Sequence, residues 1–304
     1  MRRSFPLSIL LLLVALLSTT PVLADAPQVT DKAKAEIEAA VTAANAATHH
    51  GPEKIALAGQ AVLNLPQGYD FTPAAESLRL LRALGNRPAD DVLGMVTPAG
   101  ENGEWWFMVV RYIGGGYVKD EDAKDWKADD LLKSIREGTA ESNQARRERG
   151  LPELEVVGWV EAPQYDAGTH RLVWSLASQT KGGGDGQGVN YNTLMLGREG
   201  YVSMNLVADR NRIDALKPTA RELLAALEFN AGKRYADFNA STDKVAEYGL
   251  AALVAGVAAK KLGMFAVIAA FAAKFAKLIG VAAIAGVAGL SKLFGRKKDE
   301  SGNA

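Results

Sequence analysis

Cysteine is missing from this sequence of 304 residues. Its absence excludes a disulfide framework, a thiol nucleophile, a zinc site built on cysteine and an iron–sulfur cluster. Histidine is scarce as well: the chain has three, and two of them, His49 and His50, are adjacent and therefore point apart. The sequence predicts neither a metal site nor a cofactor.

Apolar runs long enough to cross a membrane without interruption, about 20 residues, are also missing. A run at 7–17 follows Arg2 and Arg3 and precedes Ala24, which is the layout of a signal peptide cleaved after residue 24. A longer apolar stretch, 249–290, is divided by lysines that fall mostly on one side of a helix. A single crossing, a helical hairpin and a helix lying in the membrane plane all remain open for this stretch.

Charge is balanced over the whole chain, at 35 basic and 35 acidic side chains, but not along it. Residues 249–304 contain eight basic and two acidic side chains, so the segment between the two basic ends is acidic. A basic, apolar end on an acidic body is typical of a protein held at a membrane, whereas nucleic-acid binding needs a basic surface. We expect a signal peptide at 1–24, an exported domain at 25–240, an apolar helical membrane-anchor region at 241–298 and a polar tail at 299–304.

The pattern of residues 25–240 predicts an α+β fold, in which an antiparallel sheet and flanking helices are arranged like an α/β sandwich. The apolar helical membrane segment follows it. Propensity, caps and apolar spacing predict helices over 31–47, 72–85 and 129–149, and another that starts at a capping box, 219–222. Apolar or alternating runs predict strands over 55–65, 104–112, 155–161, 171–178, 189–197 and 201–208. A short hairpin at 198–200 joins the last two strands.

Two motifs that look like ligand loops have simpler interpretations. The glycine-rich residues 181–188 lack the Lys-Ser/Thr end of a phosphate loop and join two strands, so they predict a flexible loop. The acidic residues Asp120, Glu121, Asp122 and Asp125 lack the spacing of a calcium loop, so they predict a solvated turn before a capped helix.

Candidate functional residues gather in the second half of the body. His170 lies near Asp166 and Ser175 in sequence, which suggests a Ser-His-Asp arrangement, although no nucleophile elbow accompanies it. Polar groups also cluster on the strand at 189–197 and on its hairpin. Strand alternation places Asn190 and Asn192 on one face and Tyr191 on the other. The possible binding surface consists of Asp166, His170, Asn190, Tyr191, Asn192 and Arg198.

Several segments of the chain carry a resemblance to a known family. They are GYDFTP (68–73), LGN (84–86), GYVKDEDA (116–123), GWVEAPQYD…THRLVWS (158–175), VNYNT…LGREG (189–200) and GKRYADFNASTDKVAEYGLAALVAG (232–256). Over most of the mature chain the sequence resembles domain-of-unknown-function family 2167, a bacterial family described as membrane-anchored. The resemblance implies an exported domain with a C-terminal anchor and carries over no catalytic residues. The order of elements is also similar to the sandwich of photosystem-type extrinsic proteins and Mog1-like domains, an analogy of fold alone.

We therefore expect a non-enzymatic, membrane-anchored protein of the bacterial cell envelope, whose exported, periplasmic domain binds a protein partner or an envelope ligand. Its lysine-bearing tail would attach to membrane lipid. The residues predicted at the membrane interface are Lys233, Arg234, Tyr235, Lys260, Lys274, Lys277, Arg296, Lys297 and Lys298. Two alternatives remain open: an envelope hydrolase that uses His170 and Asp166, and a membrane-active helical assembly formed by the tail.

Overall fold

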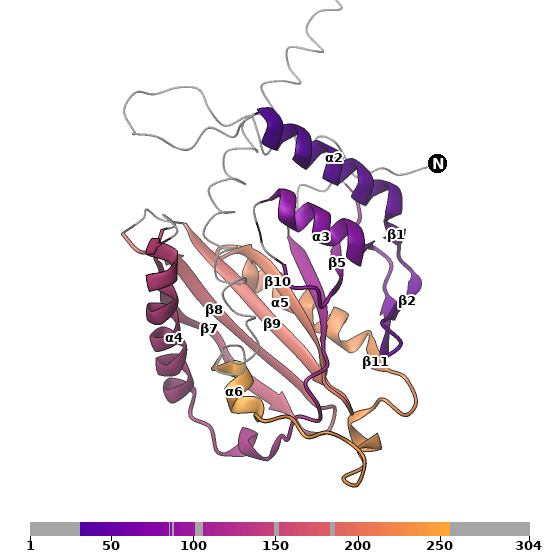
Figure 1. Cartoon of the computed structure of the whole chain (residues 1–304), viewed down its shortest axis with the longest axis vertical. Helices are drawn as coiled ribbons and strands as arrows, with labels where there is room; N and C mark the ends of the chain where they lie inside the picture. Colours follow the sequence, from indigo (N-terminus) through magenta and orange to yellow (C-terminus); the bar gives the residue numbers. More distant parts are fainter. Residues whose placement is uncertain are drawn as a thin grey trace, which may run out of the picture.

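The computed structural model describes residues 31–84, 86, 88–100, 106–148, 152–182 and 186–255. They form a mixed α/β fold built on a large antiparallel sheet of eight strands, in the order β1-β4-β5-β6-β10-β9-β8-β7 (Figure 1). A smaller sheet, β11-β3-β2, has three strands. The predicted antiparallel sheet with flanking helices is confirmed.

The helices and strands have the following bounds. In the large sheet, from one edge to the other, the strands are β1 (His49–His50), β4 (Tyr69–Pro73), β5 (Val92–Pro98), β6 (Phe107–Ile113), β10 (Tyr201–Asp209), β9 (Gln187–Leu196), β8 (Arg171–Thr180) and β7 (Leu154–Asp166). The small sheet contains β2 (Glu53–Leu57), β3 (Ala61–Leu65) and β11 (Leu227–Phe229). The helices are α2 (Asp31–Ala47), α3 (Ala74–Ala83), α4 (Ala128–Glu148), α5 (Ile213–Ala225) and α6 (Leu250–Val254), with short 3-10 turns η1 (Glu121–Lys124) and η2 (Tyr235–Asp237).

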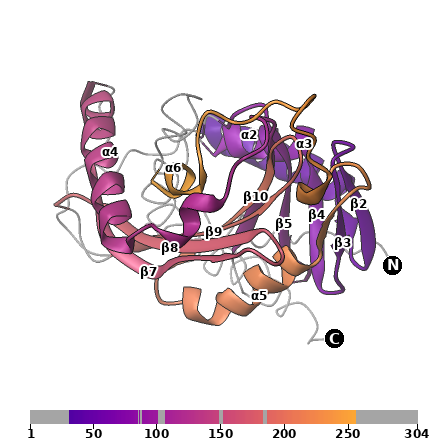
Figure 2. The same cartoon turned by 90° about the horizontal axis from the view of Figure 1, so that it is seen from below.

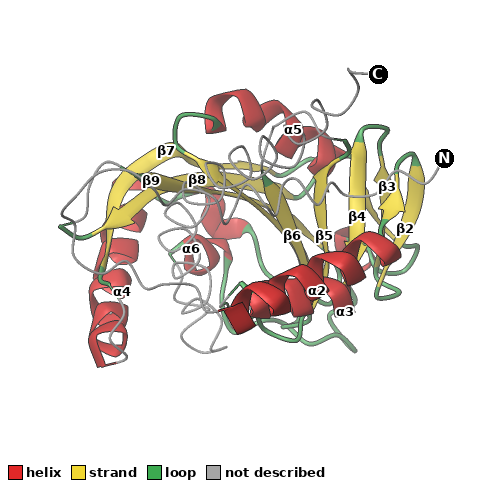
Figure 3. Ribbon diagram, turned by 90° about the horizontal axis from the view of Figure 1, so that it is seen from above, coloured by secondary structure: helices red, strands yellow, loops and turns green. Residues whose placement is uncertain are grey.

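Alternation along the strands gives the large sheet two faces, and α5 covers the first. Val202, Met204 and Leu206 of β10 are fully buried on this face, where they pack with α5 side chains such as Leu216 and Leu223. The small sheet closes the same apolar core. Figures 2 and 3 show α5 on this side of the sheet and α2, α3, α4 and α6 on the other.

The second face is covered in two separate places. At one place Leu81 of α3 packs with Phe107 and Val207, and α2 packs against α3. At the other, Leu250 and Leu253 of α6 belong to a second apolar cluster. Between the two clusters the strands carry polar side chains, and this is where the pocket described below lies.

Several predicted elements are confirmed. The helix at 31–47 has the predicted bounds, and the helix predicted at 129–149 is α4. The last four strands form the predicted meander β7-β8-β9-β10, with the hairpin at 198–200 between the final pair. The strand predicted at 104–112 is β6, and buried residues lie on both of its faces.

Other element predictions are wrong. The single strand predicted at 55–65 is a hairpin, β2–β3, because the chain turns at Ala58 and Gly59, both with positive φ (53° and 68°). The predicted capping box at 219–222 is not a helix start, since α5 begins at Ile213 and contains Pro218. Strands β1, β4, β5 and β11 were not predicted, and Thr72 and Pro73, predicted to begin a helix, end β4 instead.

The body also extends further along the chain than the sequence predicts. The expected boundary lies at 240–241, yet residues up to Ala255 pack against the sheet. Among the described residues no helix has both the length and the apolar character to span a membrane. The predicted signal peptide and most of the predicted anchor, 256–298, lie outside those residues.

Candidate functional site

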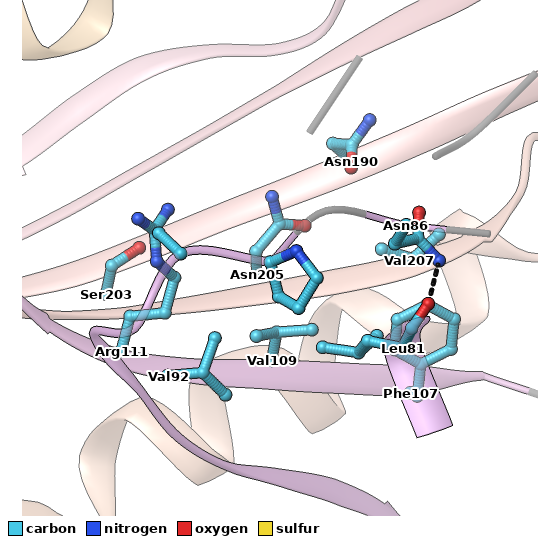
Figure 4. A pocket seen from close by; sticks show the side chains of 12 residues that line it. Leu81, Asn86, Val92, Phe107, Val109, Arg111, Asn190, Ser203, Asn205 and Val207 are labelled. Atoms are coloured by element: carbon cyan, nitrogen blue, oxygen red, sulfur yellow. Dashed lines mark hydrogen bonds between the residues drawn. The ribbon is translucent and has the colours of Figure 1, made fainter. Parts of the chain in front are cut away.

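A pocket with a volume of about 50 Å³ lies on the second face of the sheet, between the α3 cluster and the α6 cluster. We call it the Asn205 pocket. Its apolar wall contains Leu81, Val92, Phe107, Val109 and Val207. Its polar wall contains Arg111, Asn190, Ser203 and Asn205, which extend from the three central strands β6, β9 and β10 (Figure 4).

Strand register brings these polar side chains together. Ser203 of β10 pairs with Arg111 of β6, and Asn205 pairs with Asn192 of β9. Val207 pairs with Asn190, so Asn190 and Asn205 occupy diagonal positions on neighbouring strands. Residues at such positions have Cα atoms about 7–8 Å apart. One small ligand group can therefore contact both.

A chain of hydrogen bonds determines which way the Asn205 amide points. Asn192 Nδ2 donates to the backbone oxygen of Asn190 (3.2 Å), which can only accept. Asn192 Oδ1 is therefore free to accept, and it does so from Asn205 Nδ2 (3.0 Å). The Oδ1 atom of Asn205 is then an acceptor, and it is buried without a hydrogen-bond partner in the part of the chain that the structure describes. Asn190 Oδ1 is in the same state.

Arg111 brings little net charge to the pocket. Its Nε and Nη2 donate to both carboxylate oxygens of Asp91, at 2.7 Å and 2.6 Å. A bidentate bond of this kind neutralises the guanidinium and fixes its orientation. The pocket is thus close to electrically neutral, with apolar walls and two unpaired acceptors.

A second polar group, the acid–tyrosine–histidine cluster, consists of Asp120, Tyr165 and His170. Tyr165 donates its hydroxyl to Asp120 Oδ2 (2.5 Å), and His170 Nδ1 lies 3.0 Å from the same hydroxyl. Burial and, next, this bond to the Asp120 carboxylate raise the pKa of Tyr165, so its phenol stays neutral. The His170 ring lies against that of Tyr235, with centroids 4.1 Å apart.

The predicted Ser-His-Asp arrangement is wrong in its partners, because Asp166 is held by a local turn and Ser175 bonds to the neighbouring strand. Asp166 accepts from the Gly168 amide and the Thr169 hydroxyl (both 2.8 Å). Ser175 donates to the backbone oxygen of Asn190 (3.1 Å). The structure therefore places His170 beside Asp120, with Nδ1 3.5 Å from Oδ2 and the Tyr165 hydroxyl in contact with both, and it joins His170 to neither Asp166 nor Ser175.

The rest of the predicted binding surface divides between the two faces of the sheet. Asn190 lines the pocket, and Asn192 supports it. Tyr191 is fully buried on the α5 face and donates to Glu161 (3.0 Å), so it does not belong to an exposed surface. Burial and the Glu161 bond raise the pKa of Tyr191 to about 12. Arg198 binds both carboxylate oxygens of Asp243, at 2.7 Å and 2.8 Å, and lies outside the pocket.

Arg198 helps to hold what we call the C-terminal strap, residues 230–249, against the body. Tyr235 of the strap is buried and donates to the Val118 backbone oxygen (2.9 Å). Its ring stacks on Tyr117, which also bonds through its backbone to Lys244 and Ala246. The strap is thus part of the folded body and leads directly into α6.

This position corrects part of the predicted membrane interface. Tyr235 is buried in the body, and Lys233 forms an ion pair with Glu199 (2.8 Å), so these two side chains are engaged within the protein. Arg234 lies at the surface just before η2, where its amide donates to Asp237 Oδ2 (2.9 Å). The other predicted interface residues, Lys260, Lys274, Lys277, Arg296, Lys297 and Lys298, lie outside the described residues.

The acidic run has a structural role in the second apolar cluster. The two carboxylate oxygens of Asp122 accept from the amides of Leu250 (3.2 Å) and Ala251 (3.0 Å), which begin α6. Groups of three or more potential metal ligands do not occur among the residues that the structure describes. The glycine-rich loop joins β8 to β9 as predicted, and its residues 183–185 lie outside the description.

Sequence reasoning missed the importance of Arg111, Ser203 and Asn205. Two signals were present. Arg111 is a charged residue in an otherwise apolar strand, and Ser203 and Asn205 make one face of the last strand polar. A polar strand face suggests solvent, yet Asn205 is only 5% exposed. A polar strand face indicates a binding site only when it is buried. Whether it is buried depends on which elements cover the sheet, and the sequence does not show that.

The fold and the pocket together define a mixed α/β domain with a small cavity on its main sheet. The chain belongs to the family described as protein of unknown function (DUF2167), whose model matches residues 49–285. The match confirms the resemblance to that family, and it includes the body from β1 onward and part of the predicted anchor region.

Two solved structures are distantly similar to the chain. One is the cyanobacterial PsbP protein (CyanoP) of Synechocystis sp. PCC 6803, with 11% identity and a TM-score of 0.35, covering 60% of this chain and 91% of that one. The other is the Ran-binding protein Mog1p of Saccharomyces cerevisiae, with 12% identity and a TM-score of 0.30, covering 58% and 94%. Such low similarity carries no argument about function. A search of curated proteins gives no match.

Proposed function

We propose that this chain is a binding protein rather than an enzyme, held at a bacterial envelope membrane by the segment after Ala255, with the Asn205 pocket as its ligand site. The observation that carries the proposal is the buried, unpaired Oδ1 of Asn205. Leaving such an acceptor unpaired costs roughly 1–3 kcal/mol. A ligand that donates a hydrogen bond offsets this cost, which is a physical reason for the acceptor to be there.

The membrane part of the proposal rests on the sequence: a signal-peptide layout, an apolar lysine-bearing segment and a basic end. The strap supports it, because a body that is bonded firmly up to α6 would be held close to whatever the following segment enters.

Ligand binding is tested by methyl NMR on the purified full-length chain, kept in solution with detergent. The low-molecular-weight fraction extracted from bacterial envelopes is added as the probe. We expect the methyl signals of Val92, Val109 and Val207 to move, and to stay in place in the variant Asn205→Leu. If the extract leaves these three signals unmoved in the unmodified chain, the pocket is not a ligand site for envelope molecules.

Membrane attachment is tested by alkaline extraction and protease protection in a bacterial host. The full chain is compared with a chain that ends at Ala255, which keeps all of α6. We expect the full chain to resist extraction, the shortened chain to be released, and the body to be cut only from outside. Release of the full chain by alkali would remove the membrane anchor from the proposal and leave the pocket to be judged by NMR.

A further inference from the structure

The Asn205 pocket selects a ligand by what its polar wall offers. Two acceptors, the Oδ1 atoms of Asn190 and Asn205, are buried and without partners among the described residues. The hydrogen-bonded chain through Asn192 holds the Asn205 amide in this orientation. An acceptor can be satisfied only by a donor, so the ligand must bring N–H or O–H groups to these two atoms.

The charge around the pocket argues for a neutral ligand. Arg111 is the lining cation, and Asp91 neutralises it through two bonds. An anion would meet two amide oxygens and a guanidinium whose charge Asp91 already balances. A cation would lie beside Arg111 without a free carboxylate to balance it. Burial of an unbalanced charge is costly in either case.

The size and the apolar wall limit the group that enters. A cavity needs roughly 10–15 Å³ for one water molecule on this measure, so about 50 Å³ holds a group of a few non-hydrogen atoms. In the view of Figure 4, Asn190, Asn205 and Ser203 lie above the apolar side chains of Val92 and Val109. The entering group therefore has a polar end toward the amides and a short aliphatic stem.

We propose that the Asn205 pocket binds a primary carboxamide on a short aliphatic stem. Its –NH2 group carries two donor hydrogens, one for Asn190 Oδ1 and one for Asn205 Oδ1, which lie on diagonal positions of neighbouring strands. Its carbonyl oxygen accepts from the hydroxyl of Ser203, two residues before Asn205 on the same strand face. The proposal rests on the pocket being the ligand site and adds the ligand's chemical class.

Three small probes of nearly equal shape test this class: propionamide, butanone, in which a methyl group replaces the –NH2, and propionate, in which an oxygen anion replaces it. Each is titrated into the full-length, methyl-labelled chain, and the signals of Val92, Val109 and Val207 are followed. We expect propionamide to bind with a dissociation constant at least about tenfold lower than those of butanone and propionate, because neither of these can donate to the amide oxygens.

Two variants make the result specific to the pocket. Asn205→Leu removes one acceptor with little change in shape, and we expect it to abolish the preference for propionamide. Thr97→Val is the matched control, since Thr97 also carries a buried unpaired oxygen but does not line the pocket; it should leave the preference unchanged. If Asn205→Leu does not fold, Asn190→Leu removes the other acceptor.

The possible outcomes separate the ligand class from the proposed function. Butanone or propionate binding as well as propionamide would overturn the carboxamide and leave a ligand site of another class. If none of the three probes shifts the methyl signals, the carboxamide is also overturned. The envelope-extract experiment alone would then decide whether the pocket binds anything.

A blocked glutamine identifies the source of the carboxamide. Binding tighter than that of propionamide assigns it to a side chain of a protein partner. Equal or weaker binding assigns it to a free small molecule. The carboxamide class itself is decided by the comparison of propionamide with butanone and propionate.

Discussion

At the scale of the residue, the pocket depends on a few polar atoms that the fold buries at a cost. Asn205 donates one bond to Asn192 and leaves its oxygen unpaired, in a position where an apolar side chain would pack without that cost. Binding sites commonly trade stability for recognition in this way. The trade is measurable at single residues.

We expect Asn205→Leu to raise the free energy of unfolding by about 1 kcal/mol, because it removes a buried unpaired acceptor. Asn192 loses its donor, but it is partly exposed and can bond to water. Urea unfolding of the full chain checks this, with Thr97→Val expected to change in the same direction. A loss of stability in Asn205→Leu alone would mean that the Asn192 bond outweighs the unpaired oxygen.

Arg111 is expected to show the opposite behaviour. The change Arg111→Leu leaves the Asp91 carboxylate without its partner and should lower the free energy of unfolding by about 3 kcal/mol. The double change Arg111→Leu with Asp91→Leu should cost clearly less, since no charge is then left unpaired. A double-mutant cycle measures the difference. Additive losses would show that the two side chains act independently.

These residues also show how far the sequence reaches at this scale. Asn190 and Asn192 could be assigned to one strand face from alternation alone, and the structure agrees. Arg111 could not be assigned to the same surface, because β6 pairs with β10 across a long stretch of chain, and the burial of Asn205 depends on what covers the sheet. The same limit applies to His170, whose partners Asp120 and Tyr165 include one that lies far earlier in the chain.

At the scale of the element, the C-terminal strap is held by a small number of directional contacts. Arg198 binds Asp243 bidentately, and the Asn239 amide donates to the same carboxylate (2.8 Å). The Arg198 guanidinium, followed by this amide bond, holds the pKa of Asp243 well below its usual range. The sequence shows that the strap is rich in polar residues, but it does not show that the strap folds back on the body.

This lowered pKa predicts how the strap responds to acid. A carboxyl group with a lower pKa in the folded state adds stability above its ordinary pKa, about 3.9, and loses that stability as the pH falls toward the folded value. We expect the urea midpoint of the full chain to exceed that of Asp243→Asn at neutral pH, with the gap closing below about pH 5. Arg198→Gln removes the partner of Asp243, so in this background the effect of Asp243→Asn on the urea midpoint should be smaller at neutral pH. Parallel curves for the full chain and Asp243→Asn would contradict the assignment.

The start of α6 makes a second prediction at this scale. Asp122 caps this short helix from a distant part of the chain, so Asp122→Ala should lower the free energy of unfolding by about 1 kcal/mol. Hydrogen exchange of the Leu250 and Ala251 amides should become faster, while that of the central strands should change only with global stability. Unchanged exchange at these two amides would show that water replaces the cap without loss.

At the scale of the whole molecule, the body ends later than composition suggests. Residues from about 249 onward are so apolar that the sequence assigns them to a membrane region, and the expected boundary was 240–241. Apolar composition alone cannot tell a helix that packs on a sheet from one that enters lipid. The contacts of α6 with the second apolar cluster decide the matter for residues up to Ala255.

Two truncations test this boundary. A chain that ends at Tyr248 loses Leu250, Leu253 and Val254, which are almost fully buried, at about 1.5–3 kcal/mol each. Together they amount to a large part of the 5–15 kcal/mol that stabilises a typical domain. We expect this chain to unfold at clearly lower temperature and to be digested quickly by protease, while the chain that ends at Ala255 keeps the melting temperature of the full-length body. Equal melting temperatures for both truncations would show that α6 does not stabilise the body, and the body would then end at the strap.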